Sequence, residues 1–186
     1  MGRWEPGARE RLQLAALELF IEDGFEATTV AEIARRAELT ERTFYRHFSD
    51  KREVIFDGQD LLVDAFVAGV VAAPEDASPR DLAEAAVAAS GSFFTDERRP
   101  WSRRRQAAID SDTGLRERES LKMGVLARAL TAALRDRGVG DPTAELASDA
   151  AISVFRVSFA QWIAADETRS IGDIQVALFA AQRALA

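Results

Sequence analysis

Apolar residues recur every three or four positions along most of the chain, a pattern that predicts amphipathic α-helices. The sequence contains no alternating strand pattern, no repeat and no low-complexity segment. We therefore expect an all-α protein of about nine helices. The expected helices run from Pro6 to Gly24, Val30 to Ala37, Glu41 to Phe48, Lys51 to Ala73, Arg80 to Thr95, Pro100 to Asp112, Leu115 to Arg137, Pro142 to Asp166, and from a cap at Asp173 to the C-terminus.

Two threonines are placed to begin the second and third helices. Thr29 and Glu32 have the spacing of a capping box, and Thr40 is a suitable N-cap for a third helix that is too short to be stable alone. Phe44 and Phe48, four residues apart, are expected to pack against the first two helices. The opposite face carries Arg42, Tyr45 and Arg46. An anchored apolar face and a free basic face are typical of the recognition helix of a helix-turn-helix.

The start of the expected fourth helix carries two cations. Asp50 is the expected N-cap, so Lys51 and Arg52 fall in the first turn, where the helix dipole disfavours positive charge. This departure from a local rule favours phosphate binding. The alternative is that both side chains are simply solvated. The apolar pattern continues to Ala73, so we expect one unbroken helix.

The net charge of the chain is −7, which by itself argues against a nucleic-acid partner. The distribution of charge changes this conclusion. Residues 35–52 contain six basic and three acidic side chains, together with His47, the single histidine of the chain. The acidic surplus lies elsewhere, so this segment can form a positive surface on an acidic protein.

Composition excludes several other classes of protein. With 186 residues, 47% of them hydrophobic, the chain can bury one substantial core and is not intrinsically disordered. It has no cysteine, no apolar signal segment and no apolar run long enough to span a membrane, so we expect a cytoplasmic protein without a membrane partner. One histidine and no Gly-rich phosphate loop or catalytic Ser/His/Asp spacing argue against an enzyme, a metal site or a cofactor.

The last two expected helices are apolar on more than one face. A helix that is apolar all round must be buried all round, so one face can enter the core while another needs a partner. We expect a two-fold homodimer in which these helices and their copies form a four-helix bundle. The residues expected at that interface are Val154, Trp162, Ile174, Leu178 and Leu185.

Residues 9–56 resemble the N-terminal domain of the TetR family of bacterial transcriptional repressors. The motifs that carry the resemblance are Leu19-Phe20 followed by Gly24-Phe25, Thr28-Thr29-Val30 leading to Ile33-Ala34, Ala37 with Leu39, and Phe44-Tyr45-Arg46-His47-Phe48 followed by Lys51. Each motif alone is weak, but their order and spacing are specific. The family also has an all-helical body of about this length, so the resemblance extends loosely over the whole chain.

The resemblance implies a helix-turn-helix DNA-binding domain at residues 1–50 and a helical ligand-binding and dimerisation domain at residues 51–186. It implies that Thr28 or Thr29, together with Tyr45, His47 and Lys51, contacts phosphates. It places Thr40, Glu41, Arg42 and Thr43 near base edges, where an arginine can pair bidentately with guanine. For His47 the alternative is a half-buried wedge beside Phe48, and Glu41 is a departure from a plainly basic helix.

The resemblance also implies a small-molecule effector, expected to be apolar, bound among the fourth to eighth helices. The expected pocket residues are aromatic: Phe66, Phe93, Phe94, Trp101, Phe155 and Phe159. The alternative is that each is ordinary core. Five arginines between Arg98 and Arg105 could receive an acidic ligand such as an acyl-coenzyme A, although a solvated or ion-paired face is favoured.

The sequence therefore predicts a dimeric DNA-binding transcriptional regulator, a repressor that a small molecule releases from a palindromic operator. Its expected partners are double-stranded DNA, a second copy of the chain and the effector. The alternative function is that of a helical ligand-binding or protein-interaction protein that keeps the fold without binding DNA. The basic, hydroxyl-rich third helix argues against this alternative.

Overall fold

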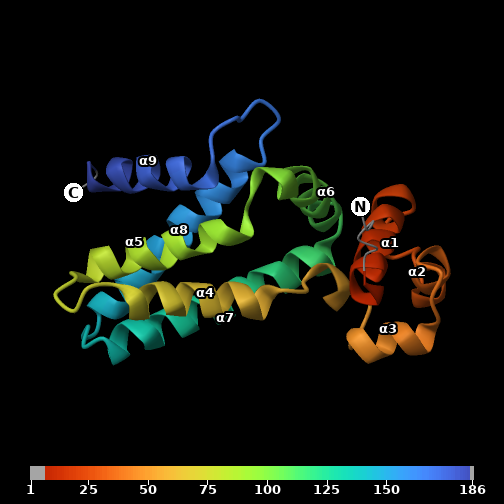
Figure 1. Cartoon of the computed structure of the whole chain (residues 1–186), viewed down its shortest axis with the longest axis horizontal. Helices are drawn as coiled ribbons and strands as arrows, with labels where there is room; N and C mark the ends of the chain where they lie inside the picture. The colour runs from red at the N-terminus through yellow and green to blue at the C-terminus, as the bar shows by residue number, and fades with distance from the viewer. Residues whose placement is uncertain (1–6, 185–186) are drawn as a thin grey trace, which may run out of the picture. The chain divides into compact units, whose positions relative to one another are not determined.

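The computed structural model describes residues 7–184, and in this range the chain is helical without a β-strand, which confirms the predicted all-α class (Figure 1). Short 3-10 segments lie at Glu53–Ile55, Ser90–Phe93 and Asp96–Arg98. The α-helices are α1 (Ala8–Glu22), α2 (Val30–Arg36), α3 (Glu41–His47), α4 (Gln59–Ala72), α5 (Pro79–Ala89), α6 (Arg99–Asp110), α7 (Thr113–Asp136), α8 (Thr143–Trp162) and α9 (Ile171–Arg183).

The prediction of one unbroken helix from Lys51 to Ala73 is wrong. The chain forms a 3-10 turn at Glu53–Ile55, and α4 begins only after Gly58, which adopts the left-handed conformation with φ 85°. The three residues 54–56 are all buried. Three consecutive residues of an α-helix spread over more than half of its circumference, so a regular helix could not bury all three on one side. The prediction that Asp50 is the N-cap of the fourth helix is also wrong, because Gly58 is the N-cap of α4, although the Asp50 Oδ1 accepts from the backbone N–H groups of residues 52 and 53.

Three other helix ends differ from the sequence prediction. The N-cap of α9 is Ser170, whose hydroxyl accepts from the backbone N–H of Asp173, the residue predicted as the cap. Helix α8 stops at Trp162 rather than Asp166, and α5 tightens into a 3-10 turn at Ser90. The predicted start of the first helix at Pro6 lies outside the described residues.

The chain folds into two compact units. One unit consists of residues 1–57 and 104–120, and the other consists of residues 58–103 and 121–186. Helices α6 and α7 each supply residues to both units, because the division falls within each of them.

In the first unit α1 packs against α2, α3 and the 3-10 turn at Glu53–Ile55. Its core is aromatic: Phe20 meets Phe25 edge-on at 5.1 Å between ring centroids, and Phe44 lies 5.4 Å from Phe48. Phe44 and Phe48 are both buried, as the sequence predicted. The apolar side of α3 is therefore fixed against α1 and α2.

In the second unit α4 packs on α5, α5 on α8, and α8 on α9, an arrangement that Figure 1 shows as neighbouring rods. The buried core runs through all of these helices and includes Leu126 and Leu130 of α7. Gly69 lets α4 approach α5 closely, since its α-carbon faces the backbone of Ala85 and Ala86. Among residues 7–184, no helix is both long enough and apolar enough to cross a membrane.

Candidate functional site

Helices α2 and α3 and the turn between them form the predicted helix-turn-helix. The capping box at the start of α2 is confirmed: the Thr29 hydroxyl accepts from the backbone N–H of Glu32 at 3.2 Å, and the Glu32 carboxylate accepts from the backbone N–H of Thr29 at 2.8 Å. In the turn Glu38 adopts a left-handed conformation with φ 54°, and the backbone N–H of Leu39 donates to the Ala34 carbonyl. Thr40 then caps α3, as predicted.

The outward face of α3 is polar and exposed. Glu41, Arg42, Tyr45 and Arg46 are all exposed, with 57% of the Tyr45 surface accessible. Thr43 is half-buried, and its hydroxyl lies 3.0 Å from the Thr40 hydroxyl. Within residues 7–184 the side chains of Arg42 and Arg46 make no hydrogen bond or ion pair. This face therefore offers free donors and acceptors to a partner.

Three of the predicted DNA-contacting side chains are turned inward. Thr28 is buried, and its hydroxyl donates to the Gly24 carbonyl at 2.8 Å. His47 is half-buried with its ring 6.3 Å from that of Phe48, which corresponds to the wedge alternative. The Lys51 ammonium donates to backbone carbonyls, as described below.

The arginines of α2 and the nearby Arg52 differ in whether their side chains are free to contact a partner. Arg36 is ion-paired with Glu22 at 2.9 Å and with Glu18 at 3.3 Å, and these carboxylates raise its pKa. Arg35 and Arg52 are exposed and, in the described part of the chain, their side chains are free of hydrogen bonds and ion pairs. Arg52 was predicted to bind phosphate together with Lys51, whereas Arg35 was not among the predicted contacts.

A second group of polar contacts holds the 3-10 turn of the first unit. The Arg105 Nε donates to the Ile55 carbonyl at 2.7 Å, and its guanidinium lies 5.2 Å from the centre of the Phe56 ring. Burial lowers the pKa of Arg105, and the nearby Glu119 carboxylate opposes this shift. Arg118 adds an ion pair with Glu53 at 2.7 Å.

The predicted effector residues gather in the second unit. Phe66 meets Phe155 edge-on at 5.3 Å, and Phe94 lies 5.7 Å from Phe155 and 5.3 Å from Phe159. Trp162, predicted for the dimer interface, joins this cluster at 5.7 Å from Phe94. Phe93 packs against the same core, whereas Trp101 makes no ring contact with another aromatic residue in the described part of the chain. Ring contacts therefore join four of the six predicted residues together with Trp162, and Phe93 packs against the same core.

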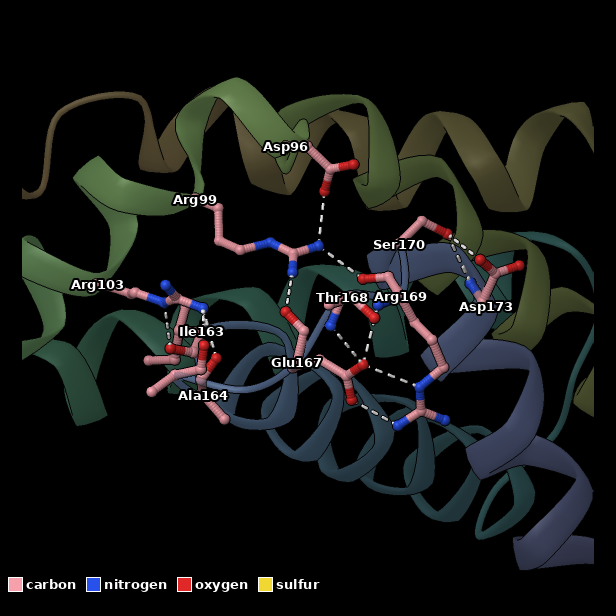
Figure 2. A network of polar contacts seen from close by, with 11 residues as sticks. Asp96, Arg99, Arg103, Ile163, Ala164, Glu167, Thr168, Arg169, Ser170 and Asp173 are labelled. Carbon is pink, nitrogen blue, oxygen red and sulfur yellow. Dashed lines mark hydrogen bonds and ion pairs between the residues drawn. The ribbon is translucent and has the colours of Figure 1, made fainter.

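Two arginines of the run near Trp101, Arg99 and Arg103, hold the segment that follows α8, and Figure 2 shows their contacts. Arg99 is buried and donates to the Glu167 and Arg169 carbonyls and to the Asp96 carboxylate. Arg103 donates to the Ile163 and Ala164 carbonyls. These arginines satisfy carbonyls that lack helical partners beyond the end of α8. The favoured alternative, a face of paired arginines, therefore describes these side chains.

Three residues predicted for a dimer interface lie inside the chain instead. Val154, Trp162 and Ile174 are buried by neighbouring helices of the same chain, so their side chains offer a partner no surface. Leu178 is half-buried, and Leu185 lies outside the described residues. The large apolar side chains that α8 and α9 leave exposed are Leu146, Val157 and Val176.

In the described part of the chain, no group of three or more His, Cys, Asp or Glu side chains could hold a metal ion. The buried polar atoms without a hydrogen-bond partner there include Trp162 Nε1, Arg99 Nε and Gln175 Oε1. All three belong to the second unit. The Arg99 guanidinium lies 5.2 Å from the centre of the Trp162 ring, so two of the three are neighbours.

Comparison with known proteins agrees with this geometry. The sequence profile described as "Bacterial regulatory proteins, tetR family" matches residues 14–57. The HTH-type transcriptional regulator TcmR of Streptomyces glaucescens is 41% identical over 71 residues, which make up 38% of this chain and only 31% of TcmR. The chain therefore spans less than a third of the length of this curated relative.

Likeness to solved structures covers almost the whole chain. The TetR family regulator PfmR from Thermus thermophilus has a TM-score of 0.54 and 26% identity, over 91% of this chain and 95% of PfmR. FadR from Bacillus subtilis, solved in complex with stearoyl-CoA, shares the fold with a TM-score of 0.62 and 14% identity, over 92% and 95% of the two chains. The sequence match therefore identifies residues 14–57 as a domain of the TetR family of bacterial regulatory proteins, and the helical fold of the whole chain is similar to that of solved TetR family regulators.

Proposed function

We propose that this protein is a dimeric DNA-binding transcriptional regulator, a repressor that a small molecule releases from a palindromic operator. The observation that carries the proposal is the outward face of α3. Its inward side is fixed by Phe44, while Arg42, Tyr45 and Arg46 are exposed and available. A polar, basic face on an anchored helix is the arrangement that reads a major groove.

Base recognition is proposed for Thr40, Glu41, Arg42 and Thr43, at the start of α3. Arg42 is the side chain that could pair bidentately with a guanine, because its guanidinium has no partner in the described part of the chain. Phosphate contacts are proposed for Thr29 and Tyr45. We remove Thr28 and His47 from the proposed contacts, because Thr28 is buried, whereas Thr29 is exposed, and because His47 is half-buried with its ring beside Phe48.

A homodimer is proposed through an exposed stripe of α8. Leu146, Ala150, Ser153, Val157 and Ala160 follow one another at intervals of four and three residues, the spacing of a helix–helix seam. Large apolar side chains stand at two of these positions, with Leu146 66% and Val157 42% exposed. On α9, Val176 is 69% exposed. A two-fold axis through this stripe would bury it against its own copy.

The effector is proposed to bind at the aromatic cluster of Phe66, Phe94, Phe155 and Phe159. This environment suits an apolar molecule, and the unpaired buried atoms of Arg99, Trp162 and Gln175 could serve its polar groups. FadR of B. subtilis, which shares the fold, was solved in complex with stearoyl-CoA. Binding would release the operator by changing the separation of the two reading helices.

Selection from a random-sequence duplex library tests the DNA-binding part of this proposal. The purified protein is expected to enrich a palindrome whose half-sites lie about 10 base pairs apart or a multiple of that. Enrichment of no sequence would refute DNA reading and favour a protein of the same fold that acts through ligands or protein partners. A reporter gene placed behind the selected duplex then separates repression from activation.

Thermal-shift screening tests the effector. Apolar acids, their coenzyme A thioesters and neutral aromatic compounds are added in separate wells. A true effector must raise the melting temperature and also release the selected duplex, since a ligand shifts an equilibrium only by its difference in affinity between two states. A compound that raises the melting temperature without releasing DNA is not the effector.

A further inference from the structure

Lys51 directs its ammonium into the turn between α1 and α2 rather than outward. Its Nζ donates to the Phe25 carbonyl at 2.6 Å and to the Thr28 carbonyl at 2.7 Å. The same nitrogen lies 4.1 Å from the centre of the Phe25 ring, within the range of a cation–π contact. A third, longer contact of 3.5 Å joins it to the Glu26 carbonyl, so all of its hydrogen bonds in the described part of the chain are made to backbone carbonyls.

The Thr28 carbonyl belongs to the peptide group that precedes α2. The N–H of that same peptide group, on Thr29, donates to the Glu32 carboxylate at 2.8 Å. Lys51 and Glu32 thus hold the two sides of one peptide plane, which has little freedom to rotate once both bonds are made. The hydrogen bond from the Thr28 hydroxyl to the Gly24 carbonyl fixes Thr28, the residue that precedes this N–H group. Together these contacts determine where α2 begins.

Other cations are better placed to meet phosphate. Arg35, Arg46 and Arg52 are exposed, and within residues 7–184 their guanidinium groups make no hydrogen bond or ion pair. Lys51 is half-buried, and burial is the main cause that lowers its pKa. To contact a phosphate it would have to leave two carbonyls and an aromatic face.

We infer that Lys51 is a positioning residue, which sets the start of α2 and thereby the placement of the helix-turn-helix, and that the exposed arginines make the phosphate contacts in its place. The inference rests on the proposed DNA-binding function and refines it. It replaces the expectation, drawn from the resemblance, that Lys51 itself contacts phosphate.

The salt dependence of DNA binding tests the inference. The slope of log K against log salt is negative, and each phosphate contact that is lost reduces its magnitude by about 0.9. Affinity for the selected duplex is measured by fluorescence anisotropy at several salt concentrations, well below the melting temperature of every variant. Lys51→Met keeps an unbranched side chain of similar length and removes both the donors and the charge that lies over the Phe25 ring. It is expected to lower the affinity about tenfold, as the loss of charge-assisted hydrogen bonds predicts, with the slope unchanged.

Arg46→Met is the matched comparison, because it also removes one cation from the same unit. It is expected to reduce the magnitude of the slope by about 0.9 and to leave the melting temperature unchanged. If Lys51→Met behaves in this way, Lys51 is a phosphate contact and the inference is overturned. If Lys51→Met lowers only the melting temperature and leaves affinity unaltered, the residue merely stabilises the fold, and the inference is also overturned.

Lys51→Gln guards against a variant that fails to fold, since its neutral amide can still donate to one carbonyl. It is expected to bind DNA between the wild type and Lys51→Met, with the full slope. Amide hydrogen exchange at Thr29 gives a readout independent of DNA, and Lys51→Met is expected to accelerate it. If the wild-type protein enriches no duplex, the proposed function fails, whereas unaltered Thr29 exchange would show that Lys51 does not hold the turn.

Discussion

Gly69 is the position at which one methyl group is expected to separate two helices. A β-carbon at this residue of α4 would lie 2.5 Å from the Ala85 carbonyl oxygen, 2.9 Å from the Ala86 α-carbon and 2.9 Å from the Ala89 β-carbon. Two of these three atoms are backbone, so no side-chain rotation can relieve the contact. Gly69→Ala must therefore move α4 away from α5.

Two opposing effects set the magnitude. Alanine is the better helix former by about 1 kcal/mol, which favours the variant. Overpacking a core costs about 1 to 3 kcal/mol, and a contact with rigid backbone belongs at the upper end of that range. We expect a net loss of about 1 to 2 kcal/mol. At about 2 to 4 °C per kcal/mol for a chain of this size, the melting temperature should fall by about 2 to 8 °C.

Gly124→Ala in α7 is the matched control. Its β-carbon would meet only the end of the Arg128 side chain, at an ordinary distance of 3.5 Å. Here the gain in helix propensity is unopposed, so the variant is expected to be more stable than the wild type by up to about 1 kcal/mol. Thermal and urea unfolding, followed by circular dichroism at one protein concentration, measure both variants. Equal stability of Gly69→Ala and Gly124→Ala would refute the close α4–α5 approach.

Three further results are expected. Arg42→Ala should reduce the discrimination between base pairs at one position of each half-site by about 1 to 3 kcal/mol. Competition with duplexes altered at single positions measures this discrimination. Unaltered selectivity would exclude Arg42 from base reading. The Arg169 guanidinium and backbone N–H hold the pKa of Glu167 at about 2, below its ordinary 4.5. A depressed folded-state pKa stabilises the fold above the ordinary pKa and loses this contribution as the pH falls through the folded value. The deficit in melting temperature of Glu167→Gln should therefore be full above pH 5 and disappear near pH 2, and a deficit independent of pH would contradict this assignment. Val157→Glu should yield monomers in sedimentation velocity. The control Leu121→Glu, which alters an exposed leucine of α7, should leave the dimer intact. If both variants dissociate the dimer, the effect is not specific to the α8 stripe.

The sequence by itself determined the features that depend on near neighbours in the chain. Helix periodicity gave the all-α class, because side chains three and four residues apart share one face. The capping box of Thr29 and Glu32 and the cap at Thr40 were predictable, since each bond joins residues three apart. The burial of Phe44 and Phe48 followed from their spacing and the short length of α3.

Only the tertiary structure decided the features that depend on distant partners. Val54, Ile55 and Phe56 are all buried beside α1, and this ends the regular helix that their local pattern predicted. Arg99 finds carbonyls 68 and 70 residues away. No local pattern could predict the burial of residues 54–56 beside α1 or the hydrogen-bond partners of Arg99.

Lys51 and α8 show the same limit at the functional surfaces. Lys51 is drawn inward by carbonyls 23 and 26 residues earlier in the chain. The apolar faces of α8 that seemed to require a second subunit are largely covered by α5 and α9 of the same chain, which leaves a narrower exposed stripe. A sequence pattern shows that a side chain is apolar or charged, but the atoms that cover or bind that side chain are chosen only when the helices pack.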